Sequence, residues 1–449
     1  MRIYEINTAV WLGGRTFAEA DWSSVPADVD AVWLMGVWER SPAGLAIARA
    51  EPGLMASFQA ALADLRPQDI IGSPYCVRDY VVDPRFGELA DARAALSARG
   101  LRLILDYVPN HVAPDHPWLS SLPEAFVQGS ADDLARDPAS YLQVGEMIVA
   151  RGRDPYFPAW PDVVQLNAFA PELRTAVLEL LSGLAAQCDG VRCDMAMLMT
   201  NEVFSRTWGL APPDEEFWPS LIASIKKQFP GFTFIAEAYW DMEYTLQQQG
   251  FDLCYDKRLY DRLAHEDAAS VRGHLSGDPA YERGLIRFIE NHDEPRAAAV
   301  FGVAKSRAAA VVISTVPGAR LYHDGQFDGF RTKIPVFLAR GPAEPSDPEL
   351  RAFYARLLTA CGELSGEWRL CETSGWPDND SQRNLVAWAW ERHLVVVNLS
   401  DAPAEAIVHH GWSGRHRFLD RLSGAEYDRE GPELYVDLAP WGSHLLARG

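Results

Sequence analysis

The sequence predicts an α/β protein, a (β/α)8 barrel of the TIM type with an insertion domain after its third strand and a C-terminal antiparallel β domain. Two observations support this prediction. Short apolar segments alternate with amphipathic helical segments through most of the chain, whereas the segments after residue 364 are closely spaced and rich in Val and Trp. Alternating strands and helices are typical of parallel βα units, and eight such units suit a closed barrel.

The predicted barrel strands are eight short runs of mainly apolar residues. The second run is rich in Val, Trp and Leu. The third run has Leu, Ile, Leu and Val in close succession, as a buried strand requires. In chain order, the predicted strands cover residues 2–7, 29–35, 101–108, 190–193, 233–236, 251–255, 285–289 and 319–322.

Helices are expected between these strands, and several carry their own boundary signals. The helix 90–99 ends before Gly100, a residue type that commonly follows a helix. Pro171 suits the first turn of the helix 171–187, which has one apolar stripe made of Leu173, Val177, Leu180, Leu181 and Leu184. The sequences Pro230-Gly231 and Pro317-Gly318 end two further helices, 217–229 and 297–315.

Two segments break the alternation of strands and helices. Residues 113–170 are too long for an ordinary connection, so we expect a small domain or an active-site wall there. The alternating segments 384–390, 393–399 and 433–438 are separated by turn residues, as in an antiparallel β domain. We therefore expect a barrel domain made of residues 1–112 and 171–363, an insertion domain of residues 113–170, and a C-terminal β-sandwich of residues 364–449.

Composition and charge exclude several classes of partner. The chain has 449 residues, of which 41 are Lys or Arg and 62 are Asp or Glu, and its formal net charge is −21. Such an acidic chain is poorly suited to bind nucleic acid or an anionic membrane surface, whereas a neutral substrate is compatible with it. The sequence contains no signal that favours a particular oligomeric state.

Location and redox state are predicted from the N-terminus and from the cysteines. The first residues include Glu5 and no long apolar run, so they do not resemble a signal peptide. The six cysteines are scattered without a Cys-x-x-Cys pair, which is typical neither of a disulfide scaffold nor of a zinc site. We expect a cytoplasmic protein with reduced thiols.

Four of the predicted strands are followed by carboxylates. These are Asp106, Asp194, Glu237 and Asp293, and Asn110, His111, Arg192 and His292 accompany them. Reactive residues of a parallel barrel lie at the C-terminal ends of its strands, so we expect these side chains to meet at one mouth. Clustered carboxylates without cysteine ligands indicate either a site for a hard metal ion or glycoside hydrolysis, which uses a pair of carboxyl groups.

The strand-end motifs resemble the four signature regions of the α-amylase family of glycoside hydrolases, in the family's order. They are Asp106-x-x-x-Asn110-His111, Gly190-x-Arg192-x-Asp194, Glu237 after an apolar strand, and Asn291-His292-Asp293. Val164-Gln165-Leu166-Asn167 resembles the family's fifth motif. Gly72-Ser73-Pro74-Tyr75, followed by Asp79-Tyr80, resembles the segment that places a stacking tyrosine. The resemblance covers nearly the whole chain and is nearer to the oligosaccharide-acting, α-glucosidase-like members.

The resemblance implies a retaining mechanism with three catalytic carboxyl groups. Asp194 would be the nucleophile that forms a covalent glycosyl intermediate. Glu237 would be the general acid and then the general base, which requires a raised pKa. Asp293 would stabilise the distorted transition state, and Arg192 would keep Asp194 ionised through its fixed positive charge.

The resemblance also implies a set of substrate-binding residues. His111 and His292 would donate hydrogen bonds to hydroxyls of the sugar that is attacked, and Tyr75 would stack against that sugar. Asp106 would mainly hold Arg192 and the base of the site. The resemblance also allows a structural calcium ion at Asn110, with Asp154 or Asp162 as candidate partners, and no other cofactor is expected.

One departure from the family pattern bears on the substrate. Many starch-cleaving members have a Lys-His pair three and four residues after the nucleophile, where this chain has Met197 and Leu198. The apolar residues remove hydrogen-bond donors on the leaving-group side. We therefore expect cleavage of α-glucosidic bonds in short oligosaccharides or small glucosides rather than in long glucans.

Three other functions remain open from the sequence. A transglycosylase or isomerase of the trehalose or sucrose type would share the covalent intermediate and differ only in the acceptor. A non-catalytic sugar-binding barrel would not need Asp194, Glu237 and Asp293 together. A carboxylate metal hydrolase would lose activity on chelation, and the positive charge of Arg192 would oppose its metal ion.

Overall fold

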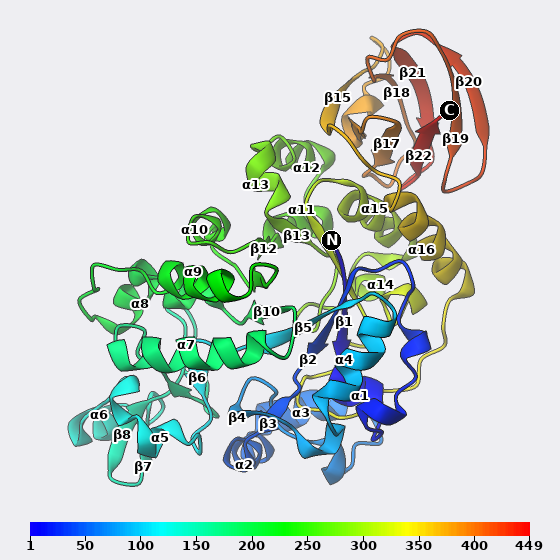
Figure 1. Ribbon diagram of the computed structural model, residues 1–449. Coiled ribbons are helices and arrows are strands. Elements are labelled where there is room, and N and C mark those ends of the chain that lie inside the picture. Colours follow the sequence, from blue (N-terminus) through cyan, green and yellow to red (C-terminus); the bar gives the residue numbers. More distant parts are fainter.

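The computed structural model describes all residues, 1–449, and its centre is a closed barrel of eight parallel strands (Figure 1). Around the barrel the strand order is β1-β14-β13-β12-β11-β10-β5-β2. The strands are β1 (Arg2–Asn7), β2 (Ala31–Met35), β5 (Arg102–Tyr107), β10 (Gly190–Cys193), β11 (Thr233–Ala236), β12 (Leu253–Tyr255), β13 (Leu285–Arg287) and β14 (Ala319–His323). Each falls on one of the eight predicted segments, so the predicted barrel is confirmed.

Helices surround the barrel and bury their apolar faces against it. The stripe predicted on α7 is buried at Leu173, Val177, Leu181 and Leu184, while Leu180 is partly exposed. The helices outside the insertion, including α2 and α3 of the excursion described below, are α1 (Thr8–Leu12), α2 (Pro42–Ala50), α3 (Pro52–Ala61), α4 (Leu89–Ala98), α7 (Pro171–Ala185), α8 (Asn201–Trp208), α9 (Trp218–Gln228), α10 (Glu243–Gln248), α11 (Lys257–His265), α12 (Ala268–His274), α13 (Pro279–Arg283), α14 (Ala297–Val300), α15 (Gly302–Thr315) and α16 (Pro348–Cys361). No helix is both long enough and apolar enough to cross a membrane.

A second excursion from the barrel follows β2 and is absent from the sequence prediction. It contains α2, α3 and a short antiparallel pair, β3 (Trp38–Arg40) with β4 (Val77–Val82). Its loop from 71 to 76 brings Tyr75 to the mouth of the barrel, where the ring lies 5.5 Å from that of His292.

A short antiparallel pair of strands, the stem, joins the insertion after β5 to the barrel. The stem strands are β6 (His111–Val112) and β9 (Val164–Gln165), which pair His111 with Gln165. Beyond the stem lie α5 (Trp118–Ser121), α6 (Ala131–Arg136) and the hairpin β7 (Tyr141–Val144)–β8 (Met147–Ala150). In Figure 1 the insertion lies at the side of the barrel away from the C-terminal domain.

The C-terminal domain is one continuous antiparallel sheet in the order β20-β19-β22-β17-β16-β15-β18-β21. The predicted domain is a β-sandwich. Here β15 pairs with β16 through its first half and with β18 through its second half, and residues of both halves share one core of 14 residues. This shared strand joins both halves of the domain. The strands are β15 (Arg369–Ser374), β16 (Leu385–Ala389), β17 (His393–Asn398), β18 (Ala404–His409), β19 (Arg415–Asp420), β20 (Glu426–Glu430), β21 (Glu433–Leu438) and β22 (Ser443–Arg448).

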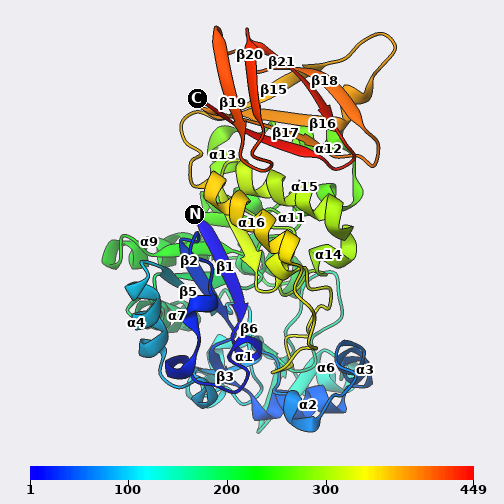
Figure 2. The same ribbon diagram turned by 90° about the vertical axis from the view of Figure 1, so that its right-hand side faces the viewer.

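Alternation along the central strands gives this sheet two buried faces. On β16, Val386 and Trp388 join the core of the barrel, while Leu385, Ala387 and Ala389 join a separate core of 14 residues within the domain. Figure 2 shows the sheet lying over α15 and α16. The indole nitrogen of Trp390 donates a hydrogen bond of 2.7 Å to the carbonyl oxygen of Thr315, which links the domain to α15. All six cysteines are free thiols.

Candidate active site

A cavity of about 320 Å³ lies at the C-terminal ends of the barrel strands, where the sequence predicts the site. Five predicted site residues lie in its wall: Tyr75, His111, Asp194, Glu237 and Asp293. The other lining residues are Ser73, Trp160, Asp162, Val163, Met195, Tyr239 and Phe337. The structure therefore brings the three predicted catalytic carboxyl groups into one cavity.

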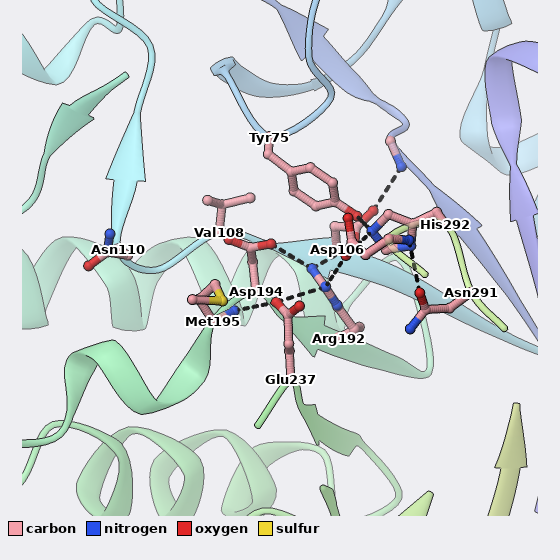
Figure 3. Close-up of polar contacts among 12 residues, drawn as sticks. Tyr75, Asp106, Val108, Asn110, Arg192, Asp194, Met195, Glu237, Asn291 and His292 are labelled. Atoms are coloured by element: carbon pink, nitrogen blue, oxygen red, sulfur yellow. Dashed lines mark hydrogen bonds and ion pairs between the residues drawn. The ribbon is translucent and has the colours of Figure 1, made fainter. Parts of the chain in front are cut away.

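Arg192 lies among the carboxyl groups (Figure 3) and does not itself line the cavity. Its Nη1 donates a 2.7 Å hydrogen bond to Oδ1 of Asp194, and its Nη2 lies 2.8 Å from Oε2 of Glu237. Asp106 and Asp293 lie slightly farther away, at 3.9 and 3.8 Å. The guanidinium is almost fully buried, so these carboxylates balance a charge that water does not reach.

Glu237 is held at both of its oxygens. The main-chain N–H of Met195 donates to Oε2 at 2.6 Å, and the hydroxyl of Tyr239 donates to Oε1 at 2.9 Å. Burial is the main cause that raises the pKa of Glu237 to about 7, and the neighbouring Asp194 also raises it, against the opposing effect of Arg192. A carboxyl group with this pKa can hold a proton near neutral pH and release it during a reaction.

The backbone turns sharply between the two catalytic carboxyl groups. Met195 directly follows Asp194 and lies in the left-handed region, with φ of 42° and ψ of 47°. This conformation is unfavourable for a residue with a side chain. In this conformation the N–H of Met195 points toward Glu237. The hydrogen bond between them links the loop after β10 to the end of β11.

His292 lies between two carboxylates on the opposite side of Arg192 (Figure 3). Its Nδ1 contacts Oε1 of Glu5, and its Nε2 lies 2.9 Å from Oδ2 of Asp293 and 2.7 Å from the hydroxyl of Tyr75. Burial disfavours the charged imidazole, but Asp293 and Glu5 outweigh it and raise the pKa of His292 to about 10. The imidazolium in turn lowers the pKa of Asp293 to about 2, although burial alone would raise it.

Asp106 lies below the cavity and does not line it. Its Oδ2 accepts a 2.8 Å hydrogen bond from the N–H of Gly36, and its main-chain oxygen accepts one of 2.7 Å from the indole of Trp38. Burial raises the pKa of Asp106 to about 6, against the opposing charge of Arg192. The position agrees with the expected role of supporting Arg192 and the base of the site.

The structure adds two polar residues that the sequence analysis does not single out. Glu5 is fully buried on β1, and besides His292 it contacts His323 at 3.2 Å, while opposing charges from both imidazoles hold its pKa well below the usual range against the effect of burial. Tyr239 follows Glu237 by two residues and lines the cavity. An acidic residue inside an otherwise apolar strand is the sequence signal for Glu5, because a buried charge requires a partner.

Met197 and Leu198 do not line the leaving-group side of the cavity. They belong to a short helical turn, 196–199, and both are fully buried in the core. Met195 lines the cavity instead, beside Glu237. The two residues expected on the leaving-group side thus lie in the core, and the residue of this turn that lines the cavity is Met195.

The residues around Asn110 do not fit the calcium ion that the resemblance allows. Asn110 lies apart from the cluster (Figure 3), and Nε2 of Gln165 donates to both its main-chain oxygen and its Oδ1 at 2.8 Å. Asp154 accepts hydrogen bonds from the main-chain N–H groups of Tyr156 and Phe157. The structure contains no group of three or more His, Cys, Asp or Glu residues that could hold a metal ion.

No protein-family model matches the chain, whereas individual known proteins do. The chain is 26% identical over 347 residues to the α-amylase MalA of Haloarcula japonica, which covers 74% of this chain and 47% of that protein. It spans about half the length of the first curated relatives that it matches.

Solved structures share the whole fold. The crystal structure of an α-amylase from Lactobacillus plantarum matches with a TM-score of 0.71 and 18% identity, over 99% of this chain and 98% of that one. The trehalulose synthase MutB from Pseudomonas mesoacidophila MX-45 matches with a TM-score of 0.70 and 16% identity, over 100% and 98%. In sequence and in structure, the neighbours of this chain are thus α-amylase family glycoside hydrolases with an eight-stranded parallel barrel, as its motifs predict.

Proposed function

We propose that the protein is a retaining glycosidase that cleaves α-glucosidic bonds of short oligosaccharides or small glucosides. The observation that carries the proposal is the contact of Asp194 and Glu237 with the two terminal nitrogens of one arginine, Arg192. This shared contact keeps the two carboxyl groups close together. A retaining mechanism needs such a pair, with a separation of about 5–5.5 Å.

In the first step of the proposed reaction, Asp194 attacks the anomeric carbon while the bond to the leaving oxygen breaks. Glu237 gives its proton to that oxygen, which its pKa of about 7 permits near neutral pH. The products of this step are a glucosyl ester on Asp194 and a free alcohol. The carboxylate of Asp293, which Arg192 and His292 hold in place, supplies fixed negative charge for the developing positive ring.

In the second step, the ionised Glu237 takes a proton from water as the water oxygen attacks the anomeric carbon. The ester bond to Asp194 breaks, and both carboxyl groups return to their starting states. Two inversions at the same carbon leave the released glucose in the α configuration.

The size of the cavity supports short substrates. A volume of about 320 Å³ lies at the lower end of the range of about 300–1,000 Å³ for small-molecule sites. Trp160 and Phe337 lie in its wall together with Tyr75. The relative MalA is named an α-amylase, and from this name we infer for the present chain only that its substrate has an α-glucosidic linkage.

The test is the hydrolysis of p-nitrophenyl α-glucoside, with the anomer of the released glucose followed by NMR. We expect α-glucose from the wild type and no release from Asp194→Ala. The exposed carboxylate Asp132 of the insertion provides a control, since Asp132→Asn should keep wild-type rates.

Azide rescue assigns the two carboxyl groups. In Asp194→Ala, azide can act as the nucleophile in place of the missing carboxylate, and the product would be the β-glucosyl azide. In Glu237→Ala it would attack the glucosyl ester from the other face and give the α-glucosyl azide. Release of β-glucose by the wild type would contradict a retaining mechanism, and products that contain an added sugar acceptor would favour transglycosylation.

A further inference from the structure

Asp162 is a buried carboxylate in the cavity wall that the proposed mechanism does not use. Its residue is only 8% exposed, and its carboxylate forms no hydrogen bond or ion pair with another residue. Its main-chain oxygen accepts a 3.0 Å hydrogen bond from the thiol of Cys76, which fixes the backbone at this point. The carboxylate has no partner in any other residue, and within the protein its hydrogen bond is to its own main-chain N–H.

The segment around Asp162 is tightly packed. The N–H of Trp160 donates to the carbonyl of Gly152 at 2.8 Å, and the N–H of Gly152 donates to the carbonyl of Val163 at 3.1 Å. A Cβ at Gly152 would lie only 2.8 Å from Cγ2 of Val163 and 3.1 Å from Cβ of His111. This wall of the cavity thus has little freedom to move Asp162 toward solvent.

An unpartnered carboxylate in such a wall is costly to bury. Burial is accordingly the main cause that raises the pKa of Asp162. The nearest opposing charge is that of Arg151, whose guanidinium is bound to the carbonyl of Pro161 and forms no ion pair with Asp162. The hydrogen-bond donors that the carboxylate lacks must therefore come from whatever occupies the cavity.

An aromatic residue of the same cavity wall, Trp160, precedes Asp162 by two positions. Trp160 lines the same cavity, and its ring lies 5.1 Å from the imidazole of His111. An indole next to a carboxylate offers an apolar surface for the C–H face of a sugar ring and two acceptor oxygens for its hydroxyls.

We propose that Asp162 is a specificity-determining residue that accepts hydrogen bonds from hydroxyl groups of the bound sugar, with Trp160 beside it as the apolar surface. This inference rests on the proposed function, because it concerns the same cavity. The hydroxyls can belong to the glucosyl unit that is transferred or to a sugar on the leaving-group side, and the experiment distinguishes these two sources.

The experiment compares Asp162→Asn and Asp162→Ala with the wild type on p-nitrophenyl α-glucoside and on maltose. We expect KM to rise about 10-fold to 100-fold where the hydroxyl contact is lost, since a hydrogen bond to a charged group has an effect of this size. If the hydroxyls belong to the glucosyl unit, both substrates are affected. If they belong to the leaving-group sugar, only maltose is affected.

Two controls separate this inference from the proposed function and from a structural role. Calorimetric titration of maltose into Asp194→Asn, with and without Asp162→Asn, measures sugar binding without turnover, so it remains informative if the wild type is inactive. Asp132→Asn should leave binding unchanged. A role in folding alone would lower Tm, whereas loss of an unpartnered buried carboxylate should preserve or raise it. Unchanged KM for both substrates together with unchanged maltose binding would overturn the inference.

Discussion

The hydroxyl of Tyr239 donates a hydrogen bond of 2.9 Å to Oε1 of Glu237, the carboxyl group with the raised pKa. The other oxygen of Glu237 is held by the N–H of Met195 and lies close to Arg192. Both oxygens are thus oriented before any substrate binds. Such contacts determine how well a general acid can reach the leaving oxygen and when it gives up its proton.

For Tyr239→Phe we expect kcat to fall about 10-fold, because the acid loses one of its orienting contacts. A hydrogen-bond donor to an ionised carboxylate lowers the pKa of that carboxyl group. Loss of the Tyr239 hydroxyl should therefore raise the pKa of Glu237 and shift the basic limb of the pH profile to higher pH. The measurement is the pH profile of kcat for an alkyl α-glucoside, whose leaving group needs the proton, beside p-nitrophenyl α-glucoside. The exposed Tyr244 provides the control Tyr244→Phe, and equal losses for both variants would contradict a role of Tyr239 through Glu237.

The pH dependence of the wild type follows from Glu237. Its pKa of about 7 means that the acid form, which the first step needs, is lost as the pH rises through that value. We therefore expect kcat/KM to decrease about 10-fold per pH unit well above pH 7. In Glu237→Gln this limb should be absent, and the remaining activity should favour substrates with good leaving groups. A basic limb that persists in Glu237→Gln would show that another group is the acid.

Glu5→Gln should cost both stability and activity. The change leaves buried His292 with one carboxylate partner, and removal of one partner from a buried pair costs about 3–5 kcal/mol of unfolding free energy. The pKa of His292 should fall below its value of about 10. Urea unfolding measures the loss, and Glu39→Gln, which breaks the partly exposed pair with Arg78, should cost about 1 kcal/mol or less.

The stability contribution of His292 has a defined pH range. Its folded pKa of about 10 lies above the unfolded value of about 6.5, so the contribution is complete below pH 6.5 and is lost as the pH rises toward 10. The stability difference between the wild type and Glu5→Gln should therefore become smaller from pH 7 to pH 10. A difference that grows over this range would contradict a cationic His292 as the partner of Glu5.

Gln165 occupies the place next to Asn110 where the family resemblance allows a calcium ion. Its side chain is fully buried and donates to three oxygens, two of Asn110 and one of Leu166. We expect a metal chelator to leave Tm unchanged, since the amide already satisfies these acceptors. Gln165→Leu should lower the unfolding free energy by about 2–3 kcal/mol, because buried acceptors lose their donor. A drop of Tm on chelation that calcium reverses would refute this prediction.

The barrel could be predicted from the sequence because each of its strands is a short apolar run that ends in a turn or a polar motif. The excursion from β3 to β4 could not, since its helices α2 and α3 contain Gly and few long apolar side chains, and Arg78 and Asp79 interrupt the apolar residues of β4. Local patterns of this kind do not distinguish a folded excursion from a loop.

The candidate site was predictable where the residues follow the ends of strands, as Asp194 and Glu237 do. The partners of these residues depend on the packing of the closed barrel. Glu5 and His292 are 287 positions apart in the chain, and only the closure of β1 onto β14 brings them into contact. The inward turn of Met197 and Leu198 likewise depends on the left-handed backbone at Met195, which the residue type does not indicate.

That left-handed residue leads to a further prediction, which separates the backbone of Met195 from its side chain. Met195→Gly should relieve backbone strain of about 1–2 kcal/mol and keep the N–H that Glu237 accepts, so the basic limb of the pH profile should stay near pH 7. Met195→Val places a β-branched side chain in the same conformation, which is more strained still. This variant should be less stable and should lose the N–H contact. Because that contact lowers the pKa of Glu237, its loss should move the basic limb to higher pH. Tm and the pH profile of kcat/KM test both variants, and equal pH profiles for the two would show that the N–H of Met195 does not tune Glu237.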